Sequence, residues 1–190
     1  MILLVNWTRM VLPFSERKRG TLWLLQVKKN QCGIALLQKT YEEDQTVATA
    51  YPYLNFAGNT EEAFNFYRSV FGGEFSGVVR FKDMPMEGVT IPRSDENKIM
   101  HISLPIGKDQ FLMASDALES LGQKLVQGNN FYICLSPDSK GEADRLFAAL
   151  SAGGKMEMPI ADAPWGDYFG SFKDKFGVQW MVNYSSKKSS

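Results

Sequence analysis

Hydrophobic residues recur at helical spacing in two stretches of the chain, and both stretches carry signals for where a helix begins and ends. The first has a single apolar stripe, formed by Ala63, Phe66, Tyr67, Val70 and Phe71. Asn59 and Glu62 have the spacing of a capping box at its start, and Gly72-Gly73 supplies a stop at its end. The pattern predicts a helix over residues 60–71.

A similar unit recurs about eighty residues further along the chain. Its capping box is Ser139 with Glu142, and its stop is Gly153-Gly154. Its apolar stripe consists of Ala143, Leu146, Phe147 and Leu150. The pattern predicts a second helix over 140–151, and therefore one module built twice.

Alternating apolar and polar residues around both helices predict β-strands. The predicted strands cover residues 51–56, 74–81, 98–106, 111–115, 131–136, 155–160 and 178–184. With an aromatic-rich, glycine-punctuated stretch over 161–173, they give two βαβββ modules, 51–116 and 129–184. Residues 82–97 form a loop long enough to be a lid or a binding loop.

One helix covers only one face of each module's sheet, so we expect the other face to close on the sister module. This predicts an α+β fold in which a curved mixed sheet surrounds a cavity. Alternation assigns Met100, Ile102 and Leu104 to a face that contacts a helix. The mixed faces are left for the cavity, with the side chains of Tyr53, Asn55, His101, Ser103, Tyr132, Cys134, Gln179 and Asn183.

Residues 1–46 have no counterpart in the repeat, and we expect them to lie outside a domain of residues 47–190. Their basic cluster, 17–19, follows the apolar run 1–14, which is the wrong order for a secretory signal. Two interpretations stay open. Val47 marks the true start of an over-extended gene, or the segment is a real arm that packs on a partner.

Composition narrows the classes of partner. Apolar residues make up 44% and charged residues 22%, an ordinary globular balance. The 21 basic and 21 acidic residues cancel, so we expect no nucleic-acid partner, and no apolar run is long enough to make the membrane a partner. Cys32 and Cys134 show no disulfide or metal-ligand spacing, which favours a cytoplasmic protein.

The segment Pro-Tyr-Leu-Asn-Phe-Ala-Gly-Asn-Thr-Glu-Glu-Ala-Phe-Asn-Phe-Tyr-Arg-Ser-Val-Phe-Gly-Gly (52–73) resembles the PhnB-like branch of the vicinal oxygen chelate superfamily, which has the glyoxalase/bleomycin-resistance fold. The likeness covers 51–184 and includes motifs at 100–104, 111–116, 165–170 and 174–180. It implies paired βαβββ modules around a cavity, often completed in a homodimer. Members of this branch have also been labelled demethylubiquinone methyltransferase-like, but no glycine-rich turn follows the first strand to hold a nucleotide-like cofactor.

In the superfamily's metalloenzymes, the first and last strands of each module supply His and Glu ligands to a divalent metal that acts as a Lewis acid. This chain departs from that pattern at every such position. In the first module, the first strand has Tyr53 and Asn55, and the last strand has Met113 and Ser115, with Asp116 one step beyond. In the second module, the first strand has Phe131, Tyr132 and Cys134, and the last strand has Met181. The ligand set for a divalent metal is therefore absent, and we predict no cofactor.

Single residues leave alternatives open. His101, the only histidine, is an acid/base group or ligand contact, or else a half-buried strand residue. Cys134 is expected to be a small buried hydrophobe rather than a reactive thiol, and Asp116 a helix cap rather than a ligand. Trp165, Tyr168 and Phe169 either close over a planar ligand or pack at a dimer seam.

The leading hypothesis is a cytoplasmic, homodimeric PhnB-like protein that sequesters a small organic molecule. The expected contacts are the cavity-facing residues named above together with Trp165 and Tyr168. The alternative is an enzyme, either a metal-dependent lyase, isomerase or dioxygenase or a metal-free acid/base catalyst centred on His101. A third possibility is an interaction module whose own side chains fill the cavity.

Overall fold

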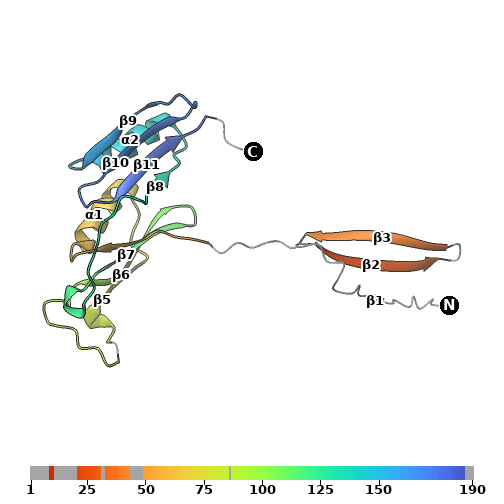
Figure 1. The fold of residues 1–190 in the computed structure, drawn as a ribbon, viewed down its shortest axis with the longest axis horizontal. Helices are drawn as coiled ribbons and strands as arrows, with labels where there is room; N and C mark the ends of the chain where they lie inside the picture. The colour runs from red at the N-terminus through yellow and green to blue at the C-terminus, as the bar shows by residue number, and fades with distance from the viewer. Residues whose placement is uncertain (1–8, 11–20, 31–32, 43–48, 86, 187–190) are drawn as a thin grey trace. The chain divides into compact units, whose positions relative to one another are not determined.

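The computed structural model describes residues 9–10, 21–30, 33–42, 49–85 and 87–186 (Figure 1). The chain divides into two compact units, Met1–Thr49 and Ala50–Ser190. The first unit holds an antiparallel sheet of β1 (Arg9–Met10), β2 (Thr21–Asn30) and β3 (Gly33–Glu42). The predicted domain start at Val47 and the end of the polar tail, 187–190, lie outside the described residues.

The second unit consists of two modules with the same topology. The first module contains β4 (Tyr53–Phe56), α1 (Thr60–Phe71), β5 (Gly77–Arg80), β6 (Ile99–Gly107) and β7 (Gln110–Asp116). The second contains β8 (Ile133–Leu135), α2 (Lys140–Ser151), β9 (Lys155–Asp162), β10 (Tyr168–Lys173) and β11 (Gln179–Tyr184). The strand orders are β4-β7-β6-β5 and β8-β11-β10-β9, and in both sheets the first strand is parallel to the last. The predicted α+β class and the two βαβββ modules are confirmed.

The predicted long loop, residues 82–97, is held by two contacts near its C-terminal end. It begins inside a short 3-10 helix, Phe81–Asp83, and a second one, Glu119–Leu121, lies after β7. The Asp95 carboxylate accepts a hydrogen bond from Ser120 and pairs with Lys98 at 2.9 Å. These two contacts, the Ser120 hydroxyl first, hold the pKa of Asp95 below its ordinary value.

Helix α1 ends as predicted but begins differently. Gly72 and Gly73 have positive φ of 79° and 77°, which favours glycine, and the Gly72 N–H donates the last helical bond to the Arg68 carbonyl at 2.8 Å. Asn59 makes no side-chain cap bond. Instead Asp116, the last residue of β7, accepts hydrogen bonds from the backbone N–H groups of Gly58 (3.0 Å) and Thr60 (3.1 Å). The predicted Asn59–Glu62 capping box is therefore wrong, because a carboxylate from a distant strand takes its place.

The cap of α2 follows the sequence more closely. Ser139 accepts a hydrogen bond from the Glu142 N–H at 3.1 Å, as predicted. The Glu142 carboxylate accepts from the N–H of Asp138 at 2.9 Å, one residue before the expected partner. The predicted cap residue is confirmed, and the return contact of the capping box is shifted by one position.

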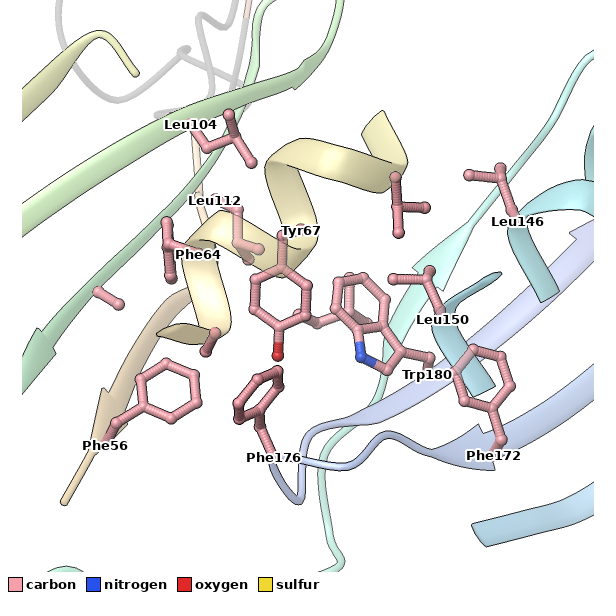
Figure 2. Packing of buried hydrophobic residues seen from close by; sticks show 14 of the residues in the cluster. Phe56, Phe64, Tyr67, Leu104, Leu112, Leu146, Leu150, Phe172, Phe176 and Trp180 are labelled. Carbon is pink, nitrogen blue, oxygen red and sulfur yellow. The ribbon is translucent and has the colours of Figure 1, made fainter. Parts of the chain in front are cut away.

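One hydrophobic core joins the two modules on the helix side of both sheets (Figure 2). The Tyr67 ring of α1 lies 5.6 Å from the Trp180 ring of β11 and 6.1 Å from the Phe176 ring. Its hydroxyl donates to Asp174 at 2.7 Å, and the Trp180 indole N–H donates to the same carboxylate at 2.9 Å. Burial, together with the Asp174 charge, raises the pKa of Tyr67. From α2, Arg145 donates to the Val70 carbonyl at 2.9 Å.

The modules therefore meet through their helical sides, which differs from the expectation that each sheet's second face closes on the sister module. We call these second faces the open faces. The described strands of the two sheets form no hydrogen-bonded pair with each other. On the first open face Tyr53 is 46% exposed. No described helix is long and apolar enough to cross a bilayer.

Candidate functional site

A cavity lies at the seam between the modules, and residues of both modules line it. We call it the seam cavity; its volume is about 240 Å³. Tyr53 and Asn55 reach it from β4, Gln179 reaches it from β11, and the linker 125–131 closes one side. Three of the side chains that alternation assigned to a cavity therefore line this one, together with Leu54, Phe56 and Val178 from the opposite face of the same segments.

A second cavity, of about 390 Å³, continues along the first open face. It is lined by Ser115 and Met100 from the sheet and by residues 123–126 of the linker. Asn55, Leu125 and Val126 line both cavities, so the two adjoin. We call the pair the linker groove. Within it the Ser115 hydroxyl donates to the Asn55 side-chain oxygen at 3.1 Å.

A β-bulge brings Met100 into this groove. The pairing of β5 with β6 shifts register between Val79 and Arg80, which pair with His101 and Ile99. Ile99 is 1% exposed and takes the core position that simple alternation gave to Met100. The prediction that Met100 contacts a helix is wrong for this reason.

The linker residues of the groove were missed as well. Leu125 and Val126 form an apolar pair in a polar connecting segment, and Val126 is 80% exposed. That pair was the available signal, because large apolar residues in an exposed linker need a surface or a ligand to cover them.

His101 adjoins the groove through Tyr53. The Tyr53 hydroxyl lies 3.3 Å from His101 Nδ1, and the ring centroids are 5.9 Å apart. Either partner can donate, depending on the imidazole tautomer. A phenol paired with an imidazole at an accessible surface is able to move a proton to or from a bound molecule.

On the second open face, Tyr132 and Gln179 are neighbours, because Ile133 pairs with Trp180 in the parallel β8–β11 ladder. The Tyr132 hydroxyl donates to Glu157 of β9 at 2.7 Å, and this bond raises the pKa of Tyr132. Gln179 is only 4% exposed. The Gln179 amide lies beside the Tyr132 phenol and lowers its pKa, which opposes the effect of Glu157.

Cys134 carries a free thiol at the surface, so the prediction of a buried hydrophobe is wrong. It lines a separate cavity of about 370 Å³ between the β6–β7 turn and the start of α2, together with Arg145. Partial burial of the sulfur raises the pKa of Cys134. The thiol is therefore mostly protonated near neutral pH and is not an activated nucleophile.

Of the ten predicted contact residues, three line the groove, and His101, Tyr132 and Cys134 lie outside it as described above; the other four also lie outside it. Ser103 is buried and receives a hydrogen bond from Ser76 at 3.0 Å. Asn183 donates to Asp167 at 3.2 Å. The other two lie elsewhere in the second module: Tyr168 donates to Asp144 of α2, and Trp165 is exposed and packs edge-on against Phe169.

The described residues at the superfamily's ligand positions do not fit a divalent metal. No cluster of three or more His, Cys, Asp or Glu side chains that could hold a metal ion occurs within the part of the chain that the structure describes. Asp116 is the carboxylate beside the predicted ligand positions. Its oxygens accept from Gly58, from Thr60 and, at 2.8 Å, from the N–H of Ile99, so they are already used by the fold.

Comparison with known proteins finds a family and several relatives that the chain resembles. The sequence matches the protein family described as 3-demethylubiquinone-9 3-methyltransferase over residues 48–183. Protein YjdN of Escherichia coli (strain K12) is 34% identical over 142 residues, which is 70% of this chain and 92% of that protein.

Two solved structures are each similar over 73% of the chain. Protein PA1353 from Pseudomonas aeruginosa is 40% identical with a TM-score of 0.64, over 73% of this chain and 98% of that one. A putative 3-demethylubiquinone-9 3-methyltransferase, PhnB protein, from Bacillus cereus is 26% identical with a TM-score of 0.53, over 73% of this chain and 100% of that one.

Proposed function

This chain belongs to the family described as 3-demethylubiquinone-9 3-methyltransferase, a PhnB-like branch of the vicinal oxygen chelate superfamily, and we propose that it works by binding a small organic molecule in the linker groove. One observation carries the proposal. The two adjoining cavities draw Tyr53, Asn55 and Ser115 from one module and Gln179 from the other. Convergent polar groups in an otherwise apolar hollow are typical of ligand sites.

We do not propose methyl transfer, although the family description names it. A nucleotide-like cofactor is commonly held at the N-terminus of a helix that follows a first strand. In this chain the N–H groups at the start of α1 donate to the Asp116 carboxylate. A protein anion already takes the place that a cofactor's anionic group would need.

We propose that a second copy of the chain covers the open faces. Large apolar side chains are exposed in the second unit: Trp165 is 61%, Phe131 60% and Met156 54% exposed. Surfaces of this kind mark interaction sites. A dimer that covers them would also enclose the linker groove, which suits sequestration of a ligand. The free thiol of Cys134 is compatible with the proposed cytoplasmic location.

The binding proposal is tested by a thermal-shift screen of aromatic metabolites and antibiotics, followed by titration of each hit. Val126→Arg places a long side chain where the two cavities adjoin and should weaken the hits at least about tenfold. Val78→Arg is the matched control, because Val78 is an exposed residue of β5 and lines neither cavity. Equal loss in both variants, or no hit at all, would contradict the proposal.

Oligomeric state is a separate measurement. Light scattering coupled to size exclusion should give twice the chain mass, and Trp165→Asp combined with Phe131→Asp should give a monomer. A monomeric parent protein would rule out the proposed dimer.

The Tyr53–His101 pair favours a second candidate, a metal-free acid/base enzyme acting on the bound ligand. If it is correct, His101→Gln and Tyr53→Phe will abolish conversion of a hit, followed by mass spectrometry, while binding changes little. We propose that no metal takes part. Elemental analysis of protein purified without a metal-affinity tag should show sub-stoichiometric zinc, nickel, manganese and iron, and a stoichiometric metal would contradict this.

A further inference from the structure

Two charged side chains line the linker groove, and both belong to its larger cavity. They are Asp116, at the end of β7, and Lys124, in the linker. In the seam cavity, by contrast, the described lining contains no Asp, Glu, Lys, Arg or His side chain. A charged group of a ligand would lose hydration in the seam cavity without gaining a counter-charge. A charged group of a bound molecule therefore belongs in the larger cavity.

The Asp116 carboxylate has no free oxygen for a ligand. The residue is 3% exposed. Its two oxygens accept hydrogen bonds from the backbone N–H groups of Gly58, Thr60 and Ile99. These donors stabilise the negative charge within the fold. Asp116 therefore does not select for a positively charged molecule.

Lys124 differs from Asp116 in both respects. The residue is exposed, and its ammonium forms no hydrogen bond or ion pair with any other residue that the structure describes. An ammonium of this kind attracts an anion and repels a cation. Among the described lining residues, Lys124 thus carries the one charge of the groove that a bound molecule can meet.

The fold fixes the part of the linker that carries Lys124. On one side of it, Gln123 Oε1 accepts a hydrogen bond from the N–H of the buried residue Leu118 at 2.8 Å. On the other side, Gln127 donates to the Phe176 carbonyl at 3.3 Å. The three residues between these contacts all line the larger cavity. The Lys124 backbone is therefore held beside that cavity at both ends.

We infer that the linker groove takes an aromatic carboxylate, with the ring in the seam cavity and the carboxylate beside Lys124 Nζ. The inference rests on the proposed binding function and names its ligand class. Tyr53 and Phe131 provide aromatic surfaces for the ring. The two cavities adjoin, so one molecule can extend from the first to the second. A single ammonium matches the single charge of a carboxylate better than the charge of about −1.5 to −2 on a phosphate ester.

The volume of the seam cavity limits the size of the ring. At about 240 Å³ it lies below the range of about 300–1,000 Å³ that is usual for drug-sized ligands, so one or two fused rings fit. Three naphthalene probes of similar shape test the charge requirement: 2-naphthylacetate, an anion; 2-naphthylacetamide, which is neutral; and 2-naphthylethylamine, a cation. Isothermal titration of the full chain should show the carboxylate binding at least about threefold more tightly than the amide and about tenfold more tightly than the amine.

Substitution of Lys124 should change the order of the three affinities. In Lys124→Gln the carboxylate and the amide should bind within about twofold of each other, because the attraction is gone. In Lys124→Glu the amine should bind more tightly than the carboxylate. Raising the ionic strength to about 1 M should also narrow the carboxylate preference of the parent protein, because charges are then screened within about 3 Å.

Lys108→Gln is the matched control, because Lys108 is an exposed lysine in the turn between β6 and β7 and lines neither cavity of the groove. It removes the same charge and should keep the parent's order and ratio of affinities. An equal loss of carboxylate preference in Lys108→Gln and Lys124→Gln would show that the overall charge of the protein sets the preference, and would overturn the inference.

The other outcomes separate the ligand class from the binding function. If the carboxylate binds no more tightly than the amide in the parent protein, or if its preference survives in Lys124→Gln, the ligand class is wrong. If no probe binds, the ligand class is also wrong. Amide binding that is lost in Val126→Arg and kept in Val78→Arg would still support binding in the groove, because the amide carries no charge for Lys124 to attract.

Discussion

Tyr67→Phe is the sharpest test of how the two modules are held together. The substitution removes one hydroxyl from a side chain with no exposed surface and leaves the ring contacts with Trp180 and Phe176 in place. The lost hydrogen bond, 2.7 Å long, reaches a buried carboxylate, that of Asp174. Bonds of this kind to a charged acceptor contribute about 1.5–3 kcal/mol. For a unit of this size the melting temperature should fall by roughly 5–10 °C.

The pH dependence gives this prediction a second, independent signature. Burial first, and then Asp174, hold the pKa of Tyr67 above the ordinary value of 10.0. Above pH 10 the unfolded chain releases the phenolic proton while the folded protein keeps it. The stabilisation is therefore complete below that pH and declines above it, by about 1.4 kcal/mol for each further pH unit. Tyr67→Phe lacks this dependence. The difference in unfolding free energy between the parent protein and Tyr67→Phe should therefore shrink between pH 10 and 11.

The assay is urea unfolding of both proteins at pH 7, 9, 10 and 11, followed by far-ultraviolet circular dichroism. Tyr132 and Tyr168 are present in both proteins, so their ionisation cancels in the difference. Tyr168→Phe is the control. Its hydroxyl bonds Asp144 at an exposed site, so the loss of unfolding free energy should be much smaller than for Tyr67→Phe at every pH. A Tyr67→Phe deficit below about 0.5 kcal/mol at pH 7, or one that stays constant to pH 11, would refute the assigned role.

Two further comparisons use the same denaturation assay. Asp116→Ala should reduce the free energy of unfolding by about 3–5 kcal/mol, because three backbone N–H groups lose their acceptor. Asn59→Ala should change it by less than about 0.5 kcal/mol, because Asn59 makes no side-chain cap bond. A larger loss in Asn59→Ala than in Asp116→Ala would restore the capping-box prediction. Gly154→Ala should lose at least about 3 kcal/mol, because its Cβ would lie 2.2 Å from the Lys173 carbonyl oxygen. Gly141 lies in the exposed first turn of α2, and an added Cβ would meet nothing within 4 Å. Gly141→Ala should therefore raise the free energy of unfolding by up to about 1 kcal/mol. Similar effects of the two glycine substitutions would contradict the packing described.

Local patterns predicted much of the architecture. The ranges predicted for both helices coincide with α1 and α2, because the apolar stripe and the glycine stop lie within the helix or directly beside it. Alternation placed Tyr53, Asn55 and Gln179 opposite the core-facing residues of their strands, since side-chain direction in a strand depends only on the residue's position. These features depend only on residues close together in the sequence, so short stretches of sequence are enough to predict them.

Features that depend on distant residues were not predicted. The acceptor at the start of α1 is Asp116, 56 residues beyond Thr60, and no local rule connects the two. The bulge that turns Met100 toward the groove involves β5 as well as β6. The meeting of the modules through their helical sides follows from contacts such as Tyr67 with Trp180, which only the assembled core defines.

Asp116 and Asp174 also set an order of events during synthesis of the protein. Asp116 is the last residue of β7, the strand that pairs with β4, so the first module has its helix cap as soon as this residue leaves the ribosome. Tyr67 must wait for Asp174, and at translation rates of about 5–20 residues per second the delay is roughly 3–12 s. During that interval the nascent chain presents an aromatic surface with no partner of its own.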